Sequence, residues 1–266
     1  MKILLVGDTH GHPYLPELIS KHAVSTGHDL IIQVGDFGYG WRGKVHGGVY
    51  VDDWARAVSQ AADDHKIDWS FIDGNHDNHP KLWQDLGNGW SPRLTYHKRG
   101  DVANIGGTVF GFLGGGVSID KKWRKVGKSW WDTETITDEQ LNRAIANFRA
   151  NNVDIIVSHD APLAFPALKH GLDDADSPWP LEQINESRNH RRRLEKVLME
   201  CQPVMWVHGH FHYAYDFMFK NPLNGVTTSV HGLAQADRGG YTKDDNYRSC
   251  FADPQDIADS TLSLDA

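Results

Sequence analysis

The most constraining feature of this sequence is a series of short apolar runs, each of which stops at residues that can bind a metal ion or carry a proton. Residues 3–6 lead into Gly7-Asp8, residues 30–34 into Gly35-Asp36, and residues 69–72 into Gly74-Asn75-His76-Asp77. Apolar runs of this length, bounded by Gly and Asp, are typical of strands buried on both faces of a parallel sheet. Open α/β sheets bind their ligands at the carboxyl ends of such strands. The sequence therefore predicts a site at one edge of a sheet.

Helical patterns separate the early runs. Pro13 opens a segment with apolar residues at helical spacing, Gly27 closes it, and a second helix is expected at residues 51–65. The first third of the chain thus alternates strand and helix, which indicates a parallel sheet. Further strands are expected near 93–97, 102–105, 108–113, 153–157, 204–207, 213–219 and 226–230, with helices from Thr137 and at 186–200. Because some of these later strands follow one another through Gly turns, we expect a mixed sheet rather than a purely parallel one.

The chain has 266 residues, of which 39% are hydrophobic, and this suffices for one α/β domain with a full core. We place the domain at residues 1–240, with surface insertions near 37–50, 114–135 and 160–185, and interpret 241–266 as a polar C-terminal tail. Two cysteines are too few for a disulfide framework. No apolar run is long enough for a membrane span or a signal peptide, so we expect a cytoplasmic protein with no membrane partner.

The charge of the chain bears on its partners. A net charge of −8 argues against a general binder of the nucleic-acid backbone, which usually carries a basic excess. The local exception is the segment 121–131, where Lys and Arg residues lie among Trp residues. Such a segment could stack a nucleobase and bind phosphates, or it could be a solvated loop that its Trp side chains anchor. Lys121, Trp123 and Arg124 are our candidate substrate contacts from this loop.

The spacing of the polar residues indicates that they act together. In extended chain, residues two apart point the same way, so Asp8 and His10 face one point, as do His210 and His212. Histidine is the commonest metal ligand in proteins. We therefore expect the residues that follow five predicted strands to converge on one site, and these are Asp8, His10, Asp36, Asn75, His76, Asp77, His159, His210 and His212.

Taken in order, the motifs Asp8-Thr9-His10, Gly35-Asp36, Gly74-Asn75-His76-Asp77, a later His159 and Gly209-His210-Phe211-His212 resemble the signature of the calcineurin-like metallophosphoesterase superfamily. The resemblance covers roughly residues 1–232. It implies a four-layer α/β/β/α sandwich, in which two mixed sheets are flanked by helices, and two divalent metal ions. By this likeness Asp8, His10 and His212 hold the first ion, Asn75, His159 and His210 hold the second, and Asp36 bridges them. Manganese is our first expectation for the metal, with iron, zinc or nickel as alternatives.

The resemblance also implies a reaction. The family hydrolyses phosphate esters, with metal-bound hydroxide attacking phosphorus and a histidine, here His76, assisting the leaving group. Many relatives continue the second motif as G-D-x-x-D-R-G, and in this chain Tyr39 stands where the second Asp would be. Asp77 or another group must then orient His76, and Arg42 is the candidate to replace the missing Arg. This departure weakens an assignment as a protein Ser/Thr phosphatase.

Three functions remain open at this point. The first is hydrolysis of a phosphate ester, either a monoester or a diester, on a small molecule or a nucleotide. The second is a nuclease or nucleotide phosphodiesterase that uses the basic Trp segment to bind nucleic acid. The third is a metal-binding scaffold without catalysis, which the presence of His76 and all seven ligands disfavours. The sequence leaves the physiological substrate and the oligomeric state undetermined.

Overall fold

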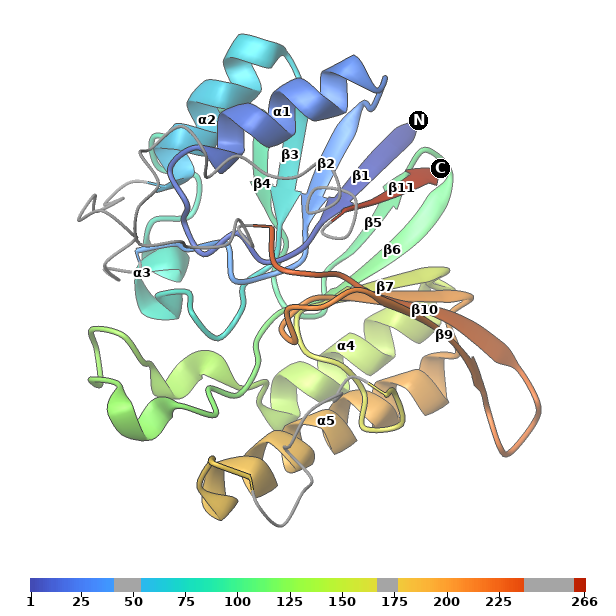
Figure 1. Ribbon diagram of the computed structural model, residues 1–266. Coiled ribbons are helices and arrows are strands. Elements are labelled where there is room, and N and C mark those ends of the chain that lie inside the picture. The colour runs from blue at the N-terminus through green and yellow to red at the C-terminus, as the bar shows by residue number, and fades with distance from the viewer. Residues whose placement is uncertain (41–53, 167–176, 237–260) are drawn as a thin grey trace.

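The computed structural model describes residues 1–40, 54–166, 177–236 and 261–266, and these form two sheets packed face to face (Figure 1). The first sheet has, in spatial order, the strands β11 (Thr261–Asp265), β1 (Lys2–Val6), β2 (Leu30–Gln33), β3 (Asp68–Phe71) and β4 (Leu94–Tyr96). Strands β1 to β4 are parallel to one another, and β11 is antiparallel to β1. The parallel order of the first strands is the one predicted from their alternation with helices.

The second sheet is also mixed. Its spatial order is β5 (Val102–Ile105), β6 (Thr108–Leu113), β7 (Ile155–Ser158), β8 (Met205–His208), β10 (Thr227–Gly232) and β9 (Tyr215–Lys220). The four central strands are parallel, while β5 and β9 pair antiparallel at the two edges. Both sheets therefore place the carboxyl ends of several parallel strands along one edge.

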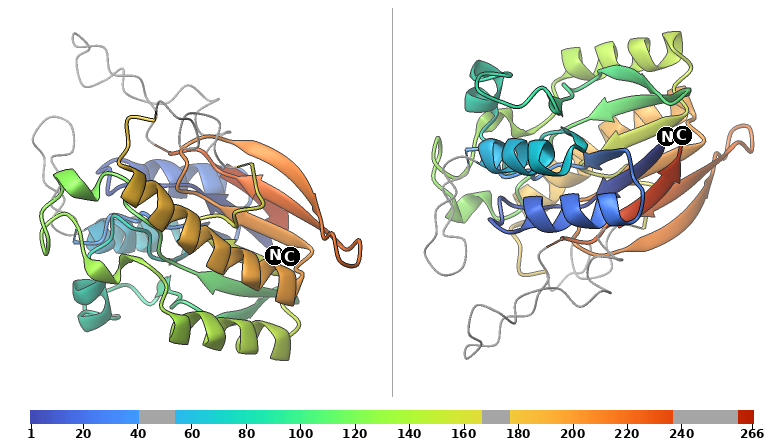
Figure 2. Two further views of the ribbon diagram at one scale, coloured as in Figure 1. Left: turned by 90° about the horizontal axis from the view of Figure 1, so that it is seen from below. Right: turned by 90° about the horizontal axis from the view of Figure 1, so that it is seen from above.

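Helices cover the outer faces of both sheets, as the views from below and above in Figure 2 show. Helices α1 (Leu15–Ser25) and α2 (Trp54–His65) pack on the first sheet, and α4 (Asp138–Ala150) and α5 (Leu181–Cys201) pack on the second. Thr137 and Gln140 form the capping box expected at the start of α4. Helix α5 begins five residues earlier than predicted, at Leu181. The four-layer α/β/β/α sandwich is confirmed.

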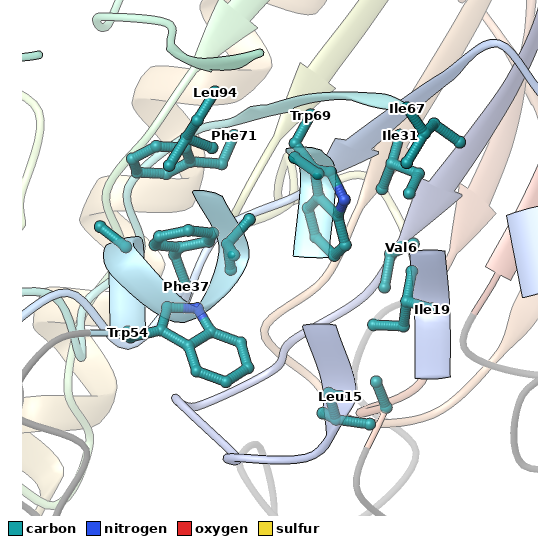
Figure 3. Close-up of a cluster of buried hydrophobic side chains, with 14 of the residues drawn as sticks. Val6, Leu15, Ile19, Ile31, Phe37, Trp54, Ile67, Trp69, Phe71 and Leu94 are labelled. Atoms are coloured by element: carbon teal, nitrogen blue, oxygen red, sulfur yellow. The ribbon is translucent and has the colours of Figure 1, made fainter. Parts of the chain in front are cut away.

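A buried apolar cluster lies between each pair of adjacent layers. The cluster between the two sheets contains Ile3, Leu5, Phe110 and Phe112, which point inward from the strands of both. Figure 3 shows the cluster between the first sheet and its helices, which includes Trp54 and Trp69. There Phe37 stacks on Phe71, with 3.8 Å between ring centroids. Since Phe37 directly follows Asp36, this stacking fixes a loop at the carboxyl edge of the sheet to the core.

The C-terminal residues differ from the prediction. The expected polar tail ends in a strand, β11, which extends the first sheet beside β1. Leu262 and Leu264 alternate with polar residues and pack against the cluster between the sheets. The Met1 amino group donates a hydrogen bond to the Ala266 carbonyl at 2.8 Å, so the two ends of the chain lie side by side (Figure 1).

Two of the expected insertions fall partly outside the described residues, namely 41–50 of the first and 167–176 of the third. The insertion at 114–135 is described throughout. It carries two short 3₁₀ helices, η1 (Lys121–Trp123) and η2 (Asp132–Glu134), and η2 contacts the short helix α3 (His79–Gln84). No helix within the described part of the chain is long and apolar enough to cross a membrane.

Candidate metal centre

The predicted ligands lie just beyond the carboxyl ends of five parallel strands. Asp8 and His10 follow β1, Asp36 follows β2, and Asn75 and His76 follow β3 in the first sheet; His159 follows β7, and His210 and His212 follow β8 in the second. The two sheets bring these residues together, since His212 of the second sheet contacts Asp8 of the first and His159 contacts Asn75. This convergence is the one expected from the strand ends.

One group of side chains gathers around Asp8. A single ligand atom from each of Asp8, His10, Asp36 and His212 can be chosen so that all four lie within 4.8 Å of one another. Within this group, Nε2 of His212 is 3.1 Å from Oδ2 of Asp8 and 3.2 Å from Nε2 of His10. Two carboxylates and two imidazoles at these distances form a donor set that suits a divalent transition metal.

A second group gathers around His159. Its Nε2 is 3.0 Å from Oδ1 of Asn75 and 3.2 Å from Nδ1 of His210. Its Nδ1 lies 3.1 Å from the carbonyl oxygen of Val34, which fits an Nδ1–H donor and leaves Nε2 as the atom that would face a metal ion, beside the amide oxygen and the other imidazole. Three atoms that can each donate a lone pair thus point at one place.

Asp36 lies between the two groups. Its Oδ1 is 3.4 Å from Nε2 of His159, and its Oδ2 is 3.7 Å from Nδ1 of His10. Oδ2 is buried and accepts no hydrogen bond from the described residues. A buried carboxylate oxygen without a hydrogen bond is costly, and a cation would remove that cost. The residues present therefore fit a bridging position between two metal ions.

The backbone at the ligands is held in an uncommon conformation. Four of the candidate ligands have positive φ angles, which are 46° at His10, 51° at Asp36, 71° at His210 and 61° at His212. Non-glycine residues rarely adopt this region, and such strain persists where the surrounding structure imposes it, often at functional sites. The strand ends are therefore built to aim these side chains rather than to make relaxed turns.

Two glycines allow the close approach of these loops. A Cβ atom added to Gly74 would collide with the backbone nitrogen and Oδ1 of Asp36 and with the His159 ring, and one added to Gly209 would collide with Oδ1 of Asp8. The backbone thus passes directly against the two carboxylates. Gly74 and Gly209 are therefore needed because no side chain would fit at these positions beside Asp36 and Asp8.

The pKa values show that the centre attracts positive charge. Burial acts to raise the pKa of Asp8 and of Asp36, but the His159 imidazole and further histidines outweigh it and hold both pKa values below the usual range. Burial acts to lower the pKa of His159, yet the Asp36 and Asp8 carboxylates raise it to about 10. Burial lowers the pKa of His210 to about 4, which leaves its imidazole neutral. Two ionised carboxylates in a buried cluster favour a bound cation.

His76 lies at the margin of the first group. Its Nε2 is 3.9 Å from Oδ2 of Asp36, and its ring meets that of His10 edge to face at 4.9 Å between centroids. Its backbone N–H donates to Oδ1 of Asp36 at 2.8 Å. Burial, reinforced by the positive charge of Arg124, lowers the pKa of His76 well below its ordinary value. The ring is close enough to act on a group bound at the centre without being part of the ligand cluster.

Arg124 lies against the His76 ring. Its Nη1 is 3.1 Å from Nδ1 of His76 and its Nη2 is 2.7 Å from Nε2, while its Nε is 2.7 Å from Oδ1 of Asp120. The candidate substrate contact Arg124 is thus brought to the centre. Of the other candidates, Lys121 forms an ion pair with Glu186, Trp123 is 61% exposed, and Arg42 lies outside the described residues.

Asp77 makes contacts other than those expected. Its carboxylate accepts hydrogen bonds from the backbone N–H groups of Phe37, Gly38 and Tyr39, and from that of Gly74. These distances lie between 2.6 and 3.1 Å. The expected contact in which Asp77 orients the His76 ring is not made, because both carboxylate oxygens are turned toward the loop that follows Asp36. Asp77 thus connects the Gly74-Asn75-His76-Asp77 segment to the loop that follows Gly35-Asp36.

Two residues that the sequence did not single out hold Asn75. Its Nδ2 donates to Oγ of Ser118 at 3.0 Å, and Ser118 donates through Oγ at 2.5 Å and through its backbone N–H at 3.1 Å to the carboxylate of Glu134. Glu134 is 1% exposed, and burial raises its pKa to about 7. Neither residue belongs to a motif, and the only sequence signal directly before Ser118 is the Gly114-Gly115-Gly116 run.

Comparisons with known proteins agree with this architecture. A family model described as calcineurin-like phosphoesterase matches residues 1–214. The structure is similar to TT1561 of Thermus thermophilus, with 13% identity, 90% of this chain and 91% of that chain covered, and a TM-score of 0.58. It is also similar to a dimetal phosphatase from Danio rerio, with 15% identity, coverage of 88% and 87%, and a TM-score of 0.53. Identities this low show a shared fold alone. A comparison with curated proteins found no match.

Proposed function

This chain belongs to the calcineurin-like phosphoesterase family, and on that premise we propose that it hydrolyses phosphate esters with two divalent metal ions. The single observation that carries the proposal is the position of Asp36, whose Oδ1 faces His159 and whose buried Oδ2 faces His10 without a hydrogen bond from the described residues. A carboxylate placed between two sets of lone-pair donors is the arrangement that a two-metal site requires.

The two groups of side chains divide the ligands. Asp8, His10 and His212 would hold the first ion, Asn75, His159 and His210 the second, and Asp36 would bridge them. Manganese is our first choice, because imidazole, carboxylate and amide oxygen together suit it, although iron, zinc and nickel accept the same donors. When bound, the two ions would lower the pKa of a water molecule and offset the negative charge on the phosphoryl group.

His76 would act on the leaving group. Its low pKa keeps the imidazole neutral, and a neutral imidazole still carries one N–H that can donate a hydrogen bond to the departing oxygen. Arg124, at 2.7 Å from the ring, would add positive charge where negative charge develops. Asp77 would serve by holding the loop after Asp36 in place through its four backbone hydrogen bonds.

A nucleotide phosphodiesterase is the second candidate, and one observation favours it. Trp123, which adjoins Arg124 in the chain, is exposed, and its ring meets that of Trp179 edge to face with 5.7 Å between centroids. The two rings offer an aromatic surface on which a base could stack. Charge reversals at Lys122 and Lys125 would test this candidate. If they leave cleavage of oligonucleotides unaltered, the loop does not bind nucleic acid.

The test of the main proposal is hydrolysis of two model substrates by the purified protein with added manganese. We expect turnover of p-nitrophenyl phosphate, of bis-p-nitrophenyl phosphate, or of both, and its loss when a chelator removes the metal. Preference for the diester would support the phosphodiesterase. Absence of turnover of either compound would favour the scaffold without catalysis.

A further inference from the structure

A cavity of about 680 Å³ opens beside the candidate centre. It lies between the start of α3 and the loop that follows η1, and its lining includes Gly40, Asn78, Lys81, Lys125, Lys128 and Ser129. Pockets of about 300–1,000 Å³ are the usual size for small-molecule sites. The cavity is therefore large enough to hold part of a substrate that extends beyond the metal centre.

The cavity is cationic within an acidic protein. Three of its lining residues are lysines, and no Asp or Glu of the described residues lines it. Lys81 forms an ion pair with Asp85, whereas neither Lys125 nor Lys128 forms an ion pair with any residue that the structure describes. The chain as a whole has a net charge of −8, so the cavity is a local concentration of positive charge that would attract a polyanion.

Arg124 connects the cavity to the reaction centre. Its Nη1 donates to the Ser129 carbonyl at 3.4 Å, and Ser129 lines the cavity. The same guanidinium lies against both ring nitrogens of His76. Asn78, which lines the cavity from the other side, is two residues beyond His76 and caps α3. The cavity is thus linked through Arg124 and Asn78 to His76, the residue proposed to assist the leaving group.

We propose that the leaving group of the substrate carries at least one further phosphate, and that this phosphate binds in the cavity to Lys125 and Lys128. The inference rests on the proposed function and adds the substrate class to it. Lysine ammonium groups bind phosphate as point charges, and Lys81 adds a third beside them. The reaction remains a hydrolysis: water forms the new bond to phosphorus, the bond to the leaving oxygen breaks, and that oxygen takes up a proton.

Two kinds of substrate present this chemistry, and matched pairs separate them. In a bisphosphate the second phosphate is an ester elsewhere on the leaving group, and in a polyphosphate it is joined through an anhydride. The measured quantity is phosphate release. The first arm compares fructose 1,6-bisphosphate with fructose 6-phosphate, and the second compares tripolyphosphate with p-nitrophenyl phosphate. Manganese is kept in excess over total phosphate in every assay.

The decisive variant is Lys125→Gln/Lys128→Gln, and its matched control is Lys21→Gln/Lys98→Gln. The control removes the same charge from two exposed lysines that do not line the cavity. We expect kcat/KM of the wild type to favour the doubly phosphorylated member of at least one pair by about tenfold or more, since a charged hydrogen bond contributes this much. The decisive variant should lose that preference through a higher KM, and the control should keep it.

The results distinguish failure of the proposed phosphate site in the cavity from failure of the proposed phosphoesterase activity. A wild type that hydrolyses p-nitrophenyl phosphate but shows no preference in either pair would overturn the inference and leave the proposed function standing. The same holds if the preference survives in Lys125→Gln/Lys128→Gln. A wild type that hydrolyses only bis-p-nitrophenyl phosphate would likewise overturn the inference alone, whereas one that hydrolyses neither that diester nor any of these compounds with manganese would overturn both.

Discussion

Asn75 presents its amide oxygen to His159 because Ser118 accepts a hydrogen bond from its amide nitrogen, with 3.0 Å on each side of the amide group. The amide of an Asn is symmetric in shape, so its orientation depends on its hydrogen-bond partners. Ser118 in turn is fixed by Glu134 through two hydrogen bonds. The segment 114–135, which contributes no candidate ligand, thereby determines which atom of the Asn75 amide faces the centre.

Ser118→Ala should weaken the second metal position. Without the hydroxyl, Nδ2 of Asn75 loses its partner and the amide is free to turn away from His159. Loss of a group that orients a ligand commonly costs about 10- to 100-fold in metal affinity. Titration of metal-free protein with manganese should show one weakened and one unchanged binding step. Ser129→Ala, in the same loop but with no contact to Asn75, serves as the control, and equal binding by both variants would refute the role of Ser118.

Glu134 should make stability depend on pH. Its pKa is about 7 in the folded protein and 4.5 when unperturbed, so between these values the folded chain holds a proton that the unfolded chain has lost. The stability it contributes is fully present below pH 4.5 and is lost as pH rises to about 7, by up to about 3 kcal/mol. Ser118 and Arg124 act in the opposite direction on this pKa, but burial outweighs them.

Urea unfolding at pH 5 and pH 8 measures this effect. Glu134→Gln removes the titrating group and keeps an acceptor for Ser118, so the difference in unfolding free energy between the two pH values should shift toward greater relative stability at pH 8. An identical pH difference in wild type and variant would show that the carboxyl group titrates normally.

His76→Ala should lower the catalytic rate without loss of metal binding. The imidazole lies outside the ligand cluster, so we expect both metal ions to remain bound. Loss of the group that assists the leaving oxygen should lower kcat by roughly 10²-fold or more. Metal analysis of the purified variant beside its kinetics is the measurement, and a metal-free His76→Ala protein would mean that His76 is a ligand instead.

Gly74→Ala should disrupt the centre although it removes no ligand. The added methyl group would collide with Asp36 and His159, and backbone atoms cannot yield as a flexible side chain would. We expect loss of metal binding together with a lower melting temperature. Gly87→Ala is a useful comparison for the methyl group itself, since nothing lies within 4 Å of its added Cβ, although its φ of 71° costs some stability. Normal metal binding by Gly74→Ala would contradict the close approach.

The positions of the candidate ligands could be predicted from the sequence because each of them lies within a few residues of a strand end. Apolar runs mark the strands, and the spacing in Asp8/His10 and His210/His212 is local, so their convergence follows from the sheet alone. The sandwich architecture came instead from the resemblance of these motifs in order. Neither step requires knowledge of loop conformations.

The supporting residues could not be predicted, because they depend on contacts between loops. Ser118 is 43 residues from Asn75, and it lies in a segment without helical or strand periodicity. Asp77 is adjacent to His76 in sequence, yet its carboxylate turns toward backbone groups 38 to 40 residues away. The strand β11 was missed because Leu262 and Leu264 alternate over only five residues at the end of a polar segment.

The central claim is that Asp36 bridges two metal ions, and metal stoichiometry tests it most directly. Wild type and Asp36→Asn, each saturated with manganese and freed of excess metal, are compared by elemental analysis per chain. We expect two ions per wild-type chain and loss of metal from Asp36→Asn, because the amide carries no charge and leaves the two ions repelling one another. Binding of a single ion by the wild type, or two ions retained by Asp36→Asn, would contradict it.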